Sequence, residues 1–277
     1  MPEARLSTAG KFEDIQDGTF YFLKKSGVPV YTIKICGDYL ASPKWGDGLR
    51  RGSVVEAELD ILFTKEQIEA LSVEEIKAGV LERLYYDEYA WLDTHPEIRY
   101  RKKTLAHGLE NVLSICPICK SRYTLKTGGH DIYCERCGHI GTLDDRYAFK
   151  DGKPFKNPLE FYEWQVKVIE REILENEDYT LTSAVTLCMR SPDGKTMLRE
   201  AGTGTATLSR QGLVYKGTLN GEDKRIEFPL ADIYRLLFGA GEDFEIYVGT
   251  EIYYFKPEEP RSCVTWYIAS RILKDNF

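Results

Sequence analysis

Two Cys-x-x-Cys pairs are the residues of this sequence with the clearest potential for chemistry. Cys116 and Cys119 form the first pair, Cys134 and Cys137 form the second, and fourteen residues separate them. Each pair fits a tight turn that directs two sulfurs inward, and four thiolates suit tetrahedral Zn²⁺. Because protein ligands would fill all four positions, none is left for water or substrate. The sequence therefore predicts a structural zinc site.

The segment between the two pairs has the pattern of a β-hairpin. Arg122–Thr127 and Asp131–Tyr133 are predicted strands, and Gly128-Gly129 is the predicted turn, so the unit is a zinc ribbon. The alternatives are a coincidental group of core cysteines or a redox pair, and a redox pair would not explain the second Cys-x-x-Cys. The remaining cysteines occur singly in apolar contexts and are predicted to be reduced core residues: Cys36, Cys188 and Cys263.

The composition is that of an ordinary globular protein. The chain has 277 residues, of which 43% are hydrophobic and 29% charged, and its net charge is −7. This length suits two or three domains. From Asn111 to Tyr147 there are five Lys or Arg residues against four Asp or Glu. Because salt-dependent phosphate binding needs several clustered cations, we expect no nucleic-acid partner.

No membrane-spanning segment is expected. No apolar run approaches the roughly 18–20 residues that a transmembrane helix needs, and no signal peptide precedes the first predicted domain. With most cysteines assigned to a metal site or to cores, we expect the chain to be cytoplasmic.

Residues 1–63 have the pattern of part of an α/β domain. A helix is predicted from Phe12 to Lys25 with Gly27 as its C-cap, and strands are predicted at Val28–Ile35 and Val54–Phe63. Two or three strands cannot cover the helices that follow, so this region resembles one half of a larger α/β unit.

Residues 64–110 are predicted to be a helical connector. Thr64-x-x-Gln67 and Ser72-x-x-Glu75 each match a capping box. A strand at Leu109–Ile115 is expected to lead into the zinc ribbon, which occupies residues 111–147. A linker region, 148–177, contains a helix predicted at Pro158–Asn176 and capped by Asn157.

Residues 178–277 are predicted to form an antiparallel β domain closed by a helix. The predicted strands are Leu181–Met189, Lys195–Glu200, Ala206–Ser209, Leu213–Thr218, Arg225–Pro229, Phe244–Val248 and Ile252–Phe255. Pro192-Asp193-Gly194 and Asn220-Gly221 are predicted turns, and Ser262 is the predicted cap of a final helix that ends near Leu273. This order resembles a pleckstrin-homology (PH) or GRAM-type barrel, so the fold class is α+β with several domains.

Several short motifs together resemble one enzyme family. They are Pro2-Glu3-Ala4-Arg5, Gly27-Val28-Pro29-Val30, Ser42-Pro43-Lys44-Trp45, the helix from Leu71 to Ile76, the segment from Tyr86 to Trp91, and the four cysteines. In this order they resemble the bacterial glycerolipid acyltransferases, specifically 1-acyl-sn-glycerol-3-phosphate acyltransferase-like proteins. The resemblance covers residues 2 to about 176 and extends more loosely to the C-terminal domain.

The resemblance implies transfer of a fatty acyl group from acyl-CoA or acyl carrier protein to lysophosphatidate. It makes Glu3 and Arg5 the substrate phosphate-binding residues, since a guanidinium group holds a phosphate monoester well. It also allows peripheral contact with the inner face of the membrane. The acidic-arginine motif is one residue shorter here than is usual in the family, because Arg5 follows Glu3 by two positions.

The catalytic His-x4-Asp of the family is expected upstream of Glu3, so we expect this chain to be the C-terminal portion of the enzyme and to be inactive alone. A literal match, His139 and Asp144, lies after the second cysteine pair, which reverses the family order. We therefore assign it no catalytic role, and none to His95, His107 or His130. The alternative hypothesis is a non-catalytic zinc-ribbon and PH-like scaffold that binds a protein or a membrane surface.

Overall fold

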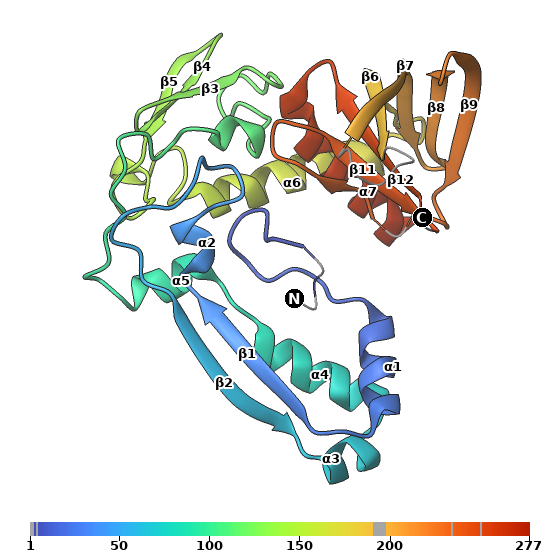
Figure 1. Ribbon diagram of the computed structural model, residues 1–277. Coiled ribbons are helices and arrows are strands. Elements are labelled where there is room, and N and C mark those ends of the chain that lie inside the picture. The colour runs from blue at the N-terminus through green and yellow to red at the C-terminus, as the bar shows by residue number, and fades with distance from the viewer. Residues whose placement is uncertain (1–2, 4, 191–197, 234, 250) are drawn as a thin grey trace.

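The structure is a computed structural model that describes residues 3, 5–190, 198–233, 235–249 and 251–277. Three antiparallel sheets of two, three and seven strands alternate with helices, which confirms the mixed α+β class. Figure 1 shows an N-terminal lobe, the region of the three-stranded sheet, and the C-terminal sheet, with α6 extending between the last two. The predicted turn Pro192-Asp193-Gly194, the start of the predicted strand 195–200, and Pro2 and Ala4 lie outside the described residues.

The N-terminal lobe contains a two-stranded ribbon and several short helices. Its elements are α1 (Asp17–Ser26), β1 (Val30–Cys36), α2 (Asp38–Ala41), β2 (Glu56–Phe63), α3 (Lys65–Ala70), α4 (Val73–Leu84) and α5 (Glu88–Asp93). Both predicted capping boxes are present, at Thr64 and Ser72. Gly27 has the left-handed φ of 59° expected of a C-cap.

The first helix begins five residues later than predicted. The amide of Phe12 donates to the carbonyl of Tyr86 at 3.0 Å, and Lys11 forms a β-bridge with Asp87. These contacts hold residues 11–12 extended against the start of α5, so the apolar residue Phe12 packs on Tyr85 and Tyr86 instead of starting a helix. A tertiary contact therefore overrides the helical periodicity here.

The region of the three-stranded sheet corrects two expectations. The predicted strand Leu109–Ile115 is wrong: a 3₁₀ turn occupies Leu109–Asn111 and follows Gly108, which has a φ of 87°. The hairpin is formed by β3 (Leu125–Gly128) and β4 (Asp131–Cys134), and an unpredicted third strand, β5 (Gly138–Thr142), pairs with β4.

The helix α6 (Pro158–Glu175) confirms the predicted linker helix and its cap. The Asn157 side chain accepts from the amide of Glu160 at 3.0 Å, and Pro158 occupies the first turn, where its missing N–H costs little.

The C-terminal sheet is antiparallel and open. Its strands are β6 (Leu181–Arg190), β7 (Leu198–Ser209), β8 (Gly212–Leu219), β9 (Glu222–Pro229), β10 (Leu237–Phe238), β11 (Phe244–Val248) and β12 (Glu251–Pro257), in the order β10-β11-β12-β6-β7-β8-β9. Within the described residues no pairing joins β9 to β10, so barrel closure is not shown. The helix α7 (Cys263–Asn276) packs on this sheet, with Trp266 stacked 4.3 Å from Phe244.

Two details of the C-terminal predictions are wrong. The segments predicted as separate strands around Glu200 and Ala206 belong to one strand, β7. The backbone of β8 approaches the glycines of β7 closely, so that a Cβ on Gly202 would lie 1.7 Å from the Thr218 carbonyl oxygen. Ser262 makes no side-chain cap for α7, because it lies in a preceding 3₁₀ turn, Pro260–Ser262.

Apolar residues form two separate cores. A small one holds the N-terminal lobe together: Ile15, Phe20, Val30, Phe63, Ile68, Ile76 and Val80. The larger core is continuous from Leu40 and Trp45 through the three-stranded sheet and α6 to the C-terminal sheet. The buried Arg50 crosses this larger core, and its Nε donates to the Tyr147 hydroxyl at 2.9 Å.

Candidate metal centre and cleft

The four cysteines of the two pairs meet at one point. Their sulfurs all lie within 4.8 Å of one another, with Cys116 3.9 Å from Cys137 and Cys119 3.8 Å from Cys134. A tetrahedron with zinc–sulfur bonds of about 2.3 Å has sulfur–sulfur edges of about 3.8 Å. The donor set and its spacing therefore fit a tetrahedral metal ion such as zinc.

Local backbone geometry produces this arrangement. The Lys120 amide donates to the Cys116 carbonyl at 3.0 Å, and Lys120 has a φ of 62°, so the first pair sits on a tight turn. The second pair is placed by the end of β4. There the Arg136 amide and the Thr124 hydroxyl approach the Cys134 sulfur at 3.4 and 3.3 Å. Such donors orient a metal-binding thiolate.

The cysteine-bearing sheet is anchored to both neighbouring elements. Arg122 pairs with Glu172 on α6, and Arg261 donates to the Leu125 carbonyl at 3.1 Å. Beneath the first cysteine pair, the fully buried Gln165 accepts from the Ser114 amide at 2.8 Å and donates to the Val112 carbonyl at 2.6 Å. The metal centre therefore lies on a rigid junction between α6 and the C-terminal sheet.

A second candidate site is a cleft of about 570 Å³ in the N-terminal lobe. It lies along β1 and beneath the first residues of the chain. Its apolar wall consists of aliphatic side chains: Leu6, Leu23, Val30, Ile33, Ile35, Val80 and Leu84. Apolar atoms make up most of its surface, and its polar side chains include Glu3, Lys34, Asp38, Tyr39, Lys44, Tyr86 and Glu88. Cavities of this size, mainly apolar with a few polar groups, are typical of small-molecule sites.

Glu88 is the most strongly perturbed carboxyl in the wall of this cleft. It is 2% exposed and accepts the Gly37 amide at 2.7 Å, at the turn that ends β1. Burial, together with the nearby charge of Asp38, raises its pKa to about 7. The carboxyl is therefore poised between its neutral and charged forms near neutral pH.

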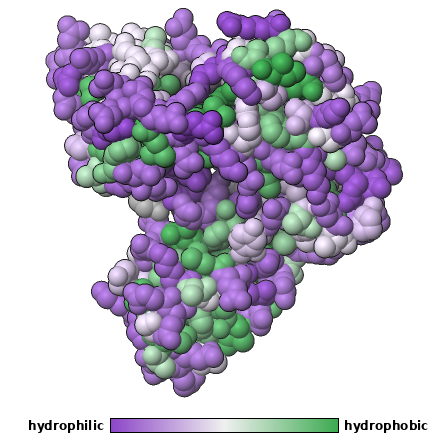
Figure 2. All heavy atoms as spheres, turned by 180° about the vertical axis from the view of Figure 1, so that it is seen from behind, coloured by the Kyte–Doolittle hydropathy of each residue, from purple (hydrophilic) through white to green (hydrophobic). Residues whose placement is uncertain are grey.

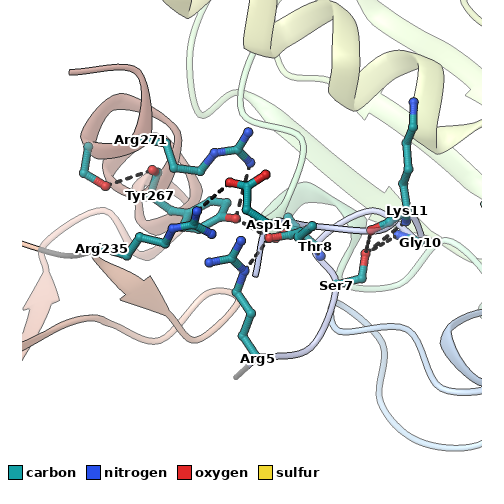
Figure 3. Close-up of polar contacts among 11 residues, drawn as sticks. Arg5, Ser7, Thr8, Gly10, Lys11, Asp14, Arg235, Tyr267 and Arg271 are labelled. Carbon is teal, nitrogen blue, oxygen red and sulfur yellow. Dashed lines mark hydrogen bonds and ion pairs between the residues drawn. The ribbon is translucent and has the colours of Figure 1, made fainter. Parts of the chain in front are cut away.

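The two residues predicted to bind phosphate, Glu3 and Arg5, have different surroundings, and only Glu3 lines the cleft. Glu3 lines the cleft, and burial raises the pKa of its carboxyl. Arg5 is 6% exposed and donates to Glu13, with its guanidinium 5.6 Å from the centre of the Tyr267 ring. Figure 3 shows Arg5 directed toward Tyr267, where Arg235 and Arg271 also gather. Arg5 therefore already has an anionic partner in this structure.

His139 and Asp144 do not act as a pair. His139 Nε2 lies 3.3 Å from Asp131, whereas the Asp144 carboxylate accepts the backbone amides of Arg146 and Ala148. Each side chain thus has a local structural partner on the surface of the three-stranded region.

The sequence predictions missed Lys44 and Glu88 as cleft residues. Both occur inside motifs that had been noted, Ser42-Pro43-Lys44-Trp45 and the segment from Tyr86 to Trp91. The signal was a charged residue placed among aromatic residues, but only the fold shows which of these charges are buried.

Comparisons with known proteins give no relative: no protein-family model matches the chain, and no curated protein does. In the part of the chain that the structure describes, no helix combines the length and apolar character required to cross a bilayer.

Proposed function

We propose that this chain is a member of the glycerolipid acyltransferase family and that its cleft binds lysophosphatidate, the acceptor of a fatty acyl group from acyl-CoA or acyl carrier protein. One observation supports this most directly. Residues from four of the motifs that carry the resemblance line the same cleft although they are far apart in the sequence: Glu3, Val30, Ser42 with Lys44, and Tyr86 with Glu88.

The composition of the cleft suits an amphiphile. Its aliphatic wall would cover an acyl chain, which is stabilised by about 0.8 kcal/mol for each buried CH₂ group. Its polar residues would contact the glycerol phosphate. No histidine lines the cleft in the described residues. In the family that the chain resembles, the general base is the histidine of a His-x4-Asp segment, and no residue of this cleft is assigned that role.

The other parts have supporting roles in this proposal. Zn²⁺ bound by Cys116, Cys119, Cys134 and Cys137 would be structural and would hold the three-stranded sheet in place. The C-terminal sheet and α7 are assigned to a PH/GRAM-type domain, which would bring the chain to the membrane surface where its substrate resides.

Calorimetric titration of the full chain with oleoyl-lysophosphatidate tests the binding proposal. We expect saturable binding at a lipid concentration below micelle formation, and no binding of glycerol 3-phosphate, which lacks the acyl chain. An assay with oleoyl-CoA and the same chain reports acyl transfer. Binding without transfer is the expected result, because this chain is expected to be inactive alone. Acyl transfer by the chain alone would overturn that expectation, and absence of binding would contradict the proposed substrate.

A matched pair of substitutions locates the ligand. Ile33 and Leu59 are directly opposite each other on β1 and β2, and both are exposed, but only Ile33 lines the cleft. Ile33→Asp should weaken lysophosphatidate binding about tenfold or more, because it places a charge in the apolar wall. Leu59→Asp should leave the affinity within about twofold. Equal effects would place the lipid elsewhere.

A further inference from the structure

Among the described residues, Lys44 is a cation without a paired carboxylate, and it lies at the boundary between two parts of the molecule. It follows α2 in the loop that leads to β2, and it lines the cleft. Its ammonium nitrogen lies 3.9 Å from the centre of the Phe238 ring, which belongs to β10 of the C-terminal sheet. The Lys44 ammonium group therefore makes a cation–π contact with Phe238, and the same side chain lines the cleft.

Other half-buried cations in the described part of the chain have direct polar partners. Arg5 pairs with Glu13, and Lys24 donates to three carbonyl groups at the end of α3. Lys274 donates to the carbonyls of Leu230 and Ala231. For Lys44, no hydrogen bond and no carboxylate within 4.0 Å is present among the described residues.

This environment is unfavourable for an isolated charge. The pKa of Lys44 is lowered to about 8, mainly by burial and also by the positive charge of Arg5. The carboxylates of Glu13 and Glu245 act in the opposite direction and are included in this value. A buried cation of this kind is stabilised when an anion occupies the adjacent space. Lys34 also lines the cleft, from the middle of β1, and it is half-buried like Lys44.

We propose that Lys44 is the anion-binding residue of the cleft and that its ammonium group pairs with the phosphate of the bound amphiphile. The inference rests on the proposed function for the identity of the amphiphile, and it assigns the phosphate to Lys44 instead of to Arg5. Lys44 has a free ammonium group facing an apolar-walled cavity, whereas the guanidinium of Arg5 is already engaged by Glu13. The Lys44 contact selects a lipid with an anionic phosphate monoester over a zwitterionic phosphodiester lipid with the same acyl chain.

The test compares three lipids with one acyl chain: oleoyl-lysophosphatidate, oleoyl-lysophosphatidylcholine and oleate. Lys44→Met keeps the length of the side chain and removes its charge. We expect it to weaken lysophosphatidate binding about tenfold or more, as loss of a charge-assisted hydrogen bond predicts, and to change lysophosphatidylcholine binding less than about twofold. A comparable loss for oleate would show that the site accepts any anionic head group and would overturn selectivity for phosphate.

Two variants serve as controls for the residue assignment. Lys34→Met removes a charge from the same cleft and should weaken binding by less than about threefold. Arg5→Met tests the rival cation. If Lys44→Met binds lysophosphatidate like the unmodified chain, or if Arg5→Met alone loses the phosphate preference, the Lys44 proposal is overturned while lipid binding itself stands. If the unmodified chain binds none of the lipids, both proposals fail.

A readout without ligand protects the test against misfolding. Lys44→Met removes no ion pair among the described residues and only the contact of the ammonium group with the Phe238 ring, so it should change the melting temperature little. The pH dependence adds a second signature. Binding requires the charged ammonium group. The affinity should therefore fall as the pH rises above about 8, which is the pKa of Lys44 in the ligand-free protein. Lys44→Arg should retain binding without this decline. A marked fall in melting temperature for Lys44→Met would instead assign the residue a structural role.

Discussion

The chain contains two small antiparallel units, the sheet β3–β5 and the ribbon β1–β2, which differ in how far their apolar side chains are buried. In the three-stranded sheet β3–β5, inward residues are covered: Leu125 and Ile132 are each 1% exposed, and four sulfurs converge beyond the end of the hairpin. In the ribbon β1–β2, the corresponding apolar residues remain open. Tyr31 is 64% exposed, and Leu59 is 68% exposed. Figure 2 shows apolar surface gathered on this lobe.

The helix α4 contacts the polar side of the ribbon β1–β2, where the carboxylates remain exposed. Arg83 of α4 donates to Glu58 at 3.1 Å and lies 3.9 Å from Asp60. These carboxylates alternate with the apolar residues of β2, so Leu59 and Ile61 face the other way. At the Val30–Phe63 end of the ribbon, away from the segment that joins β1 to β2, the register shifts between Val30 and Tyr31, and the Phe63 ring lies against Gly79 of α4. The helix therefore contacts β2 at Phe63 and again near Glu58.

This difference has a functional consequence. The four sulfurs beside the sheet β3–β5 are placed to hold a metal ion, whereas an isolated two-stranded ribbon has only marginal stability of its own. Its open apolar residues Tyr31, Ile33 and Ile35 instead form part of the cleft wall. Structural rigidity and ligand capacity are thus divided between the two units.

The largest effect is expected from removal of one sulfur. Cys134→Ser should abolish stoichiometric zinc binding and strongly lower the melting temperature, because structural zinc contributes on the order of 10 kcal/mol of binding free energy in small zinc domains. Zinc content by atomic absorption and a thermal scan measure the two effects. The matched control is Cys36→Ser in the ribbon β1–β2, because Cys36 is a free cysteine that does not belong to the cluster of four sulfurs. Equal zinc content in both variants would refute the ligand assignment.

A smaller effect is expected at Glu88, where the open lobe contains a buried carboxyl. Its pKa is about 7 in the folded chain and about 4.3 in the unfolded chain, so the folded state binds more protons between these values. The free energy of unfolding should therefore fall as pH rises from about 4.5 to 7, by up to about 3 kcal/mol. Urea unfolding across this range measures it.

Glu88→Gln isolates this contribution. Glutamine can still accept the Gly37 amide but does not titrate, so the variant should show a flatter pH profile than the unmodified chain and greater stability at pH 8. Identical profiles would show that Glu88 is charged in the folded state at all these pH values.

Features fixed by local sequence could be predicted. The cysteine spacing, the capping boxes at Thr64 and Ser72, and the Asn157 cap of α6 each depend on residues within a few positions of one another. The structure brings the four cysteines together as expected because two short turns and one hairpin are sufficient to do so.

Features that depend on distant contacts could not be predicted. The glycines of β7 resemble strand breaks in the sequence, yet they permit the close approach of β8. The short strand β5 contains two glycines and has little β-propensity, so its pairing with β4 is what defines it. The environment of Lys44 depends on Phe238, far along the chain, and no local pattern reveals it.

The smallest effect is expected on the open face itself, and it tests the comparison between the two units directly. Leu125→Thr and Leu59→Thr are the same substitution in the covered and the open unit. Leu125→Thr should lower the free energy of unfolding by about 2–4 kcal/mol, since it removes buried carbon and buries a hydroxyl. Leu59→Thr should change it by less than about 0.5 kcal/mol, because the side chain is already in water. Urea unfolding at a fixed pH measures both values. If Leu59→Thr lowered the free energy of unfolding by more than about 1.5 kcal/mol, this face would be covered in solution. The two units would then differ in what covers their apolar residues and not in whether these residues are covered.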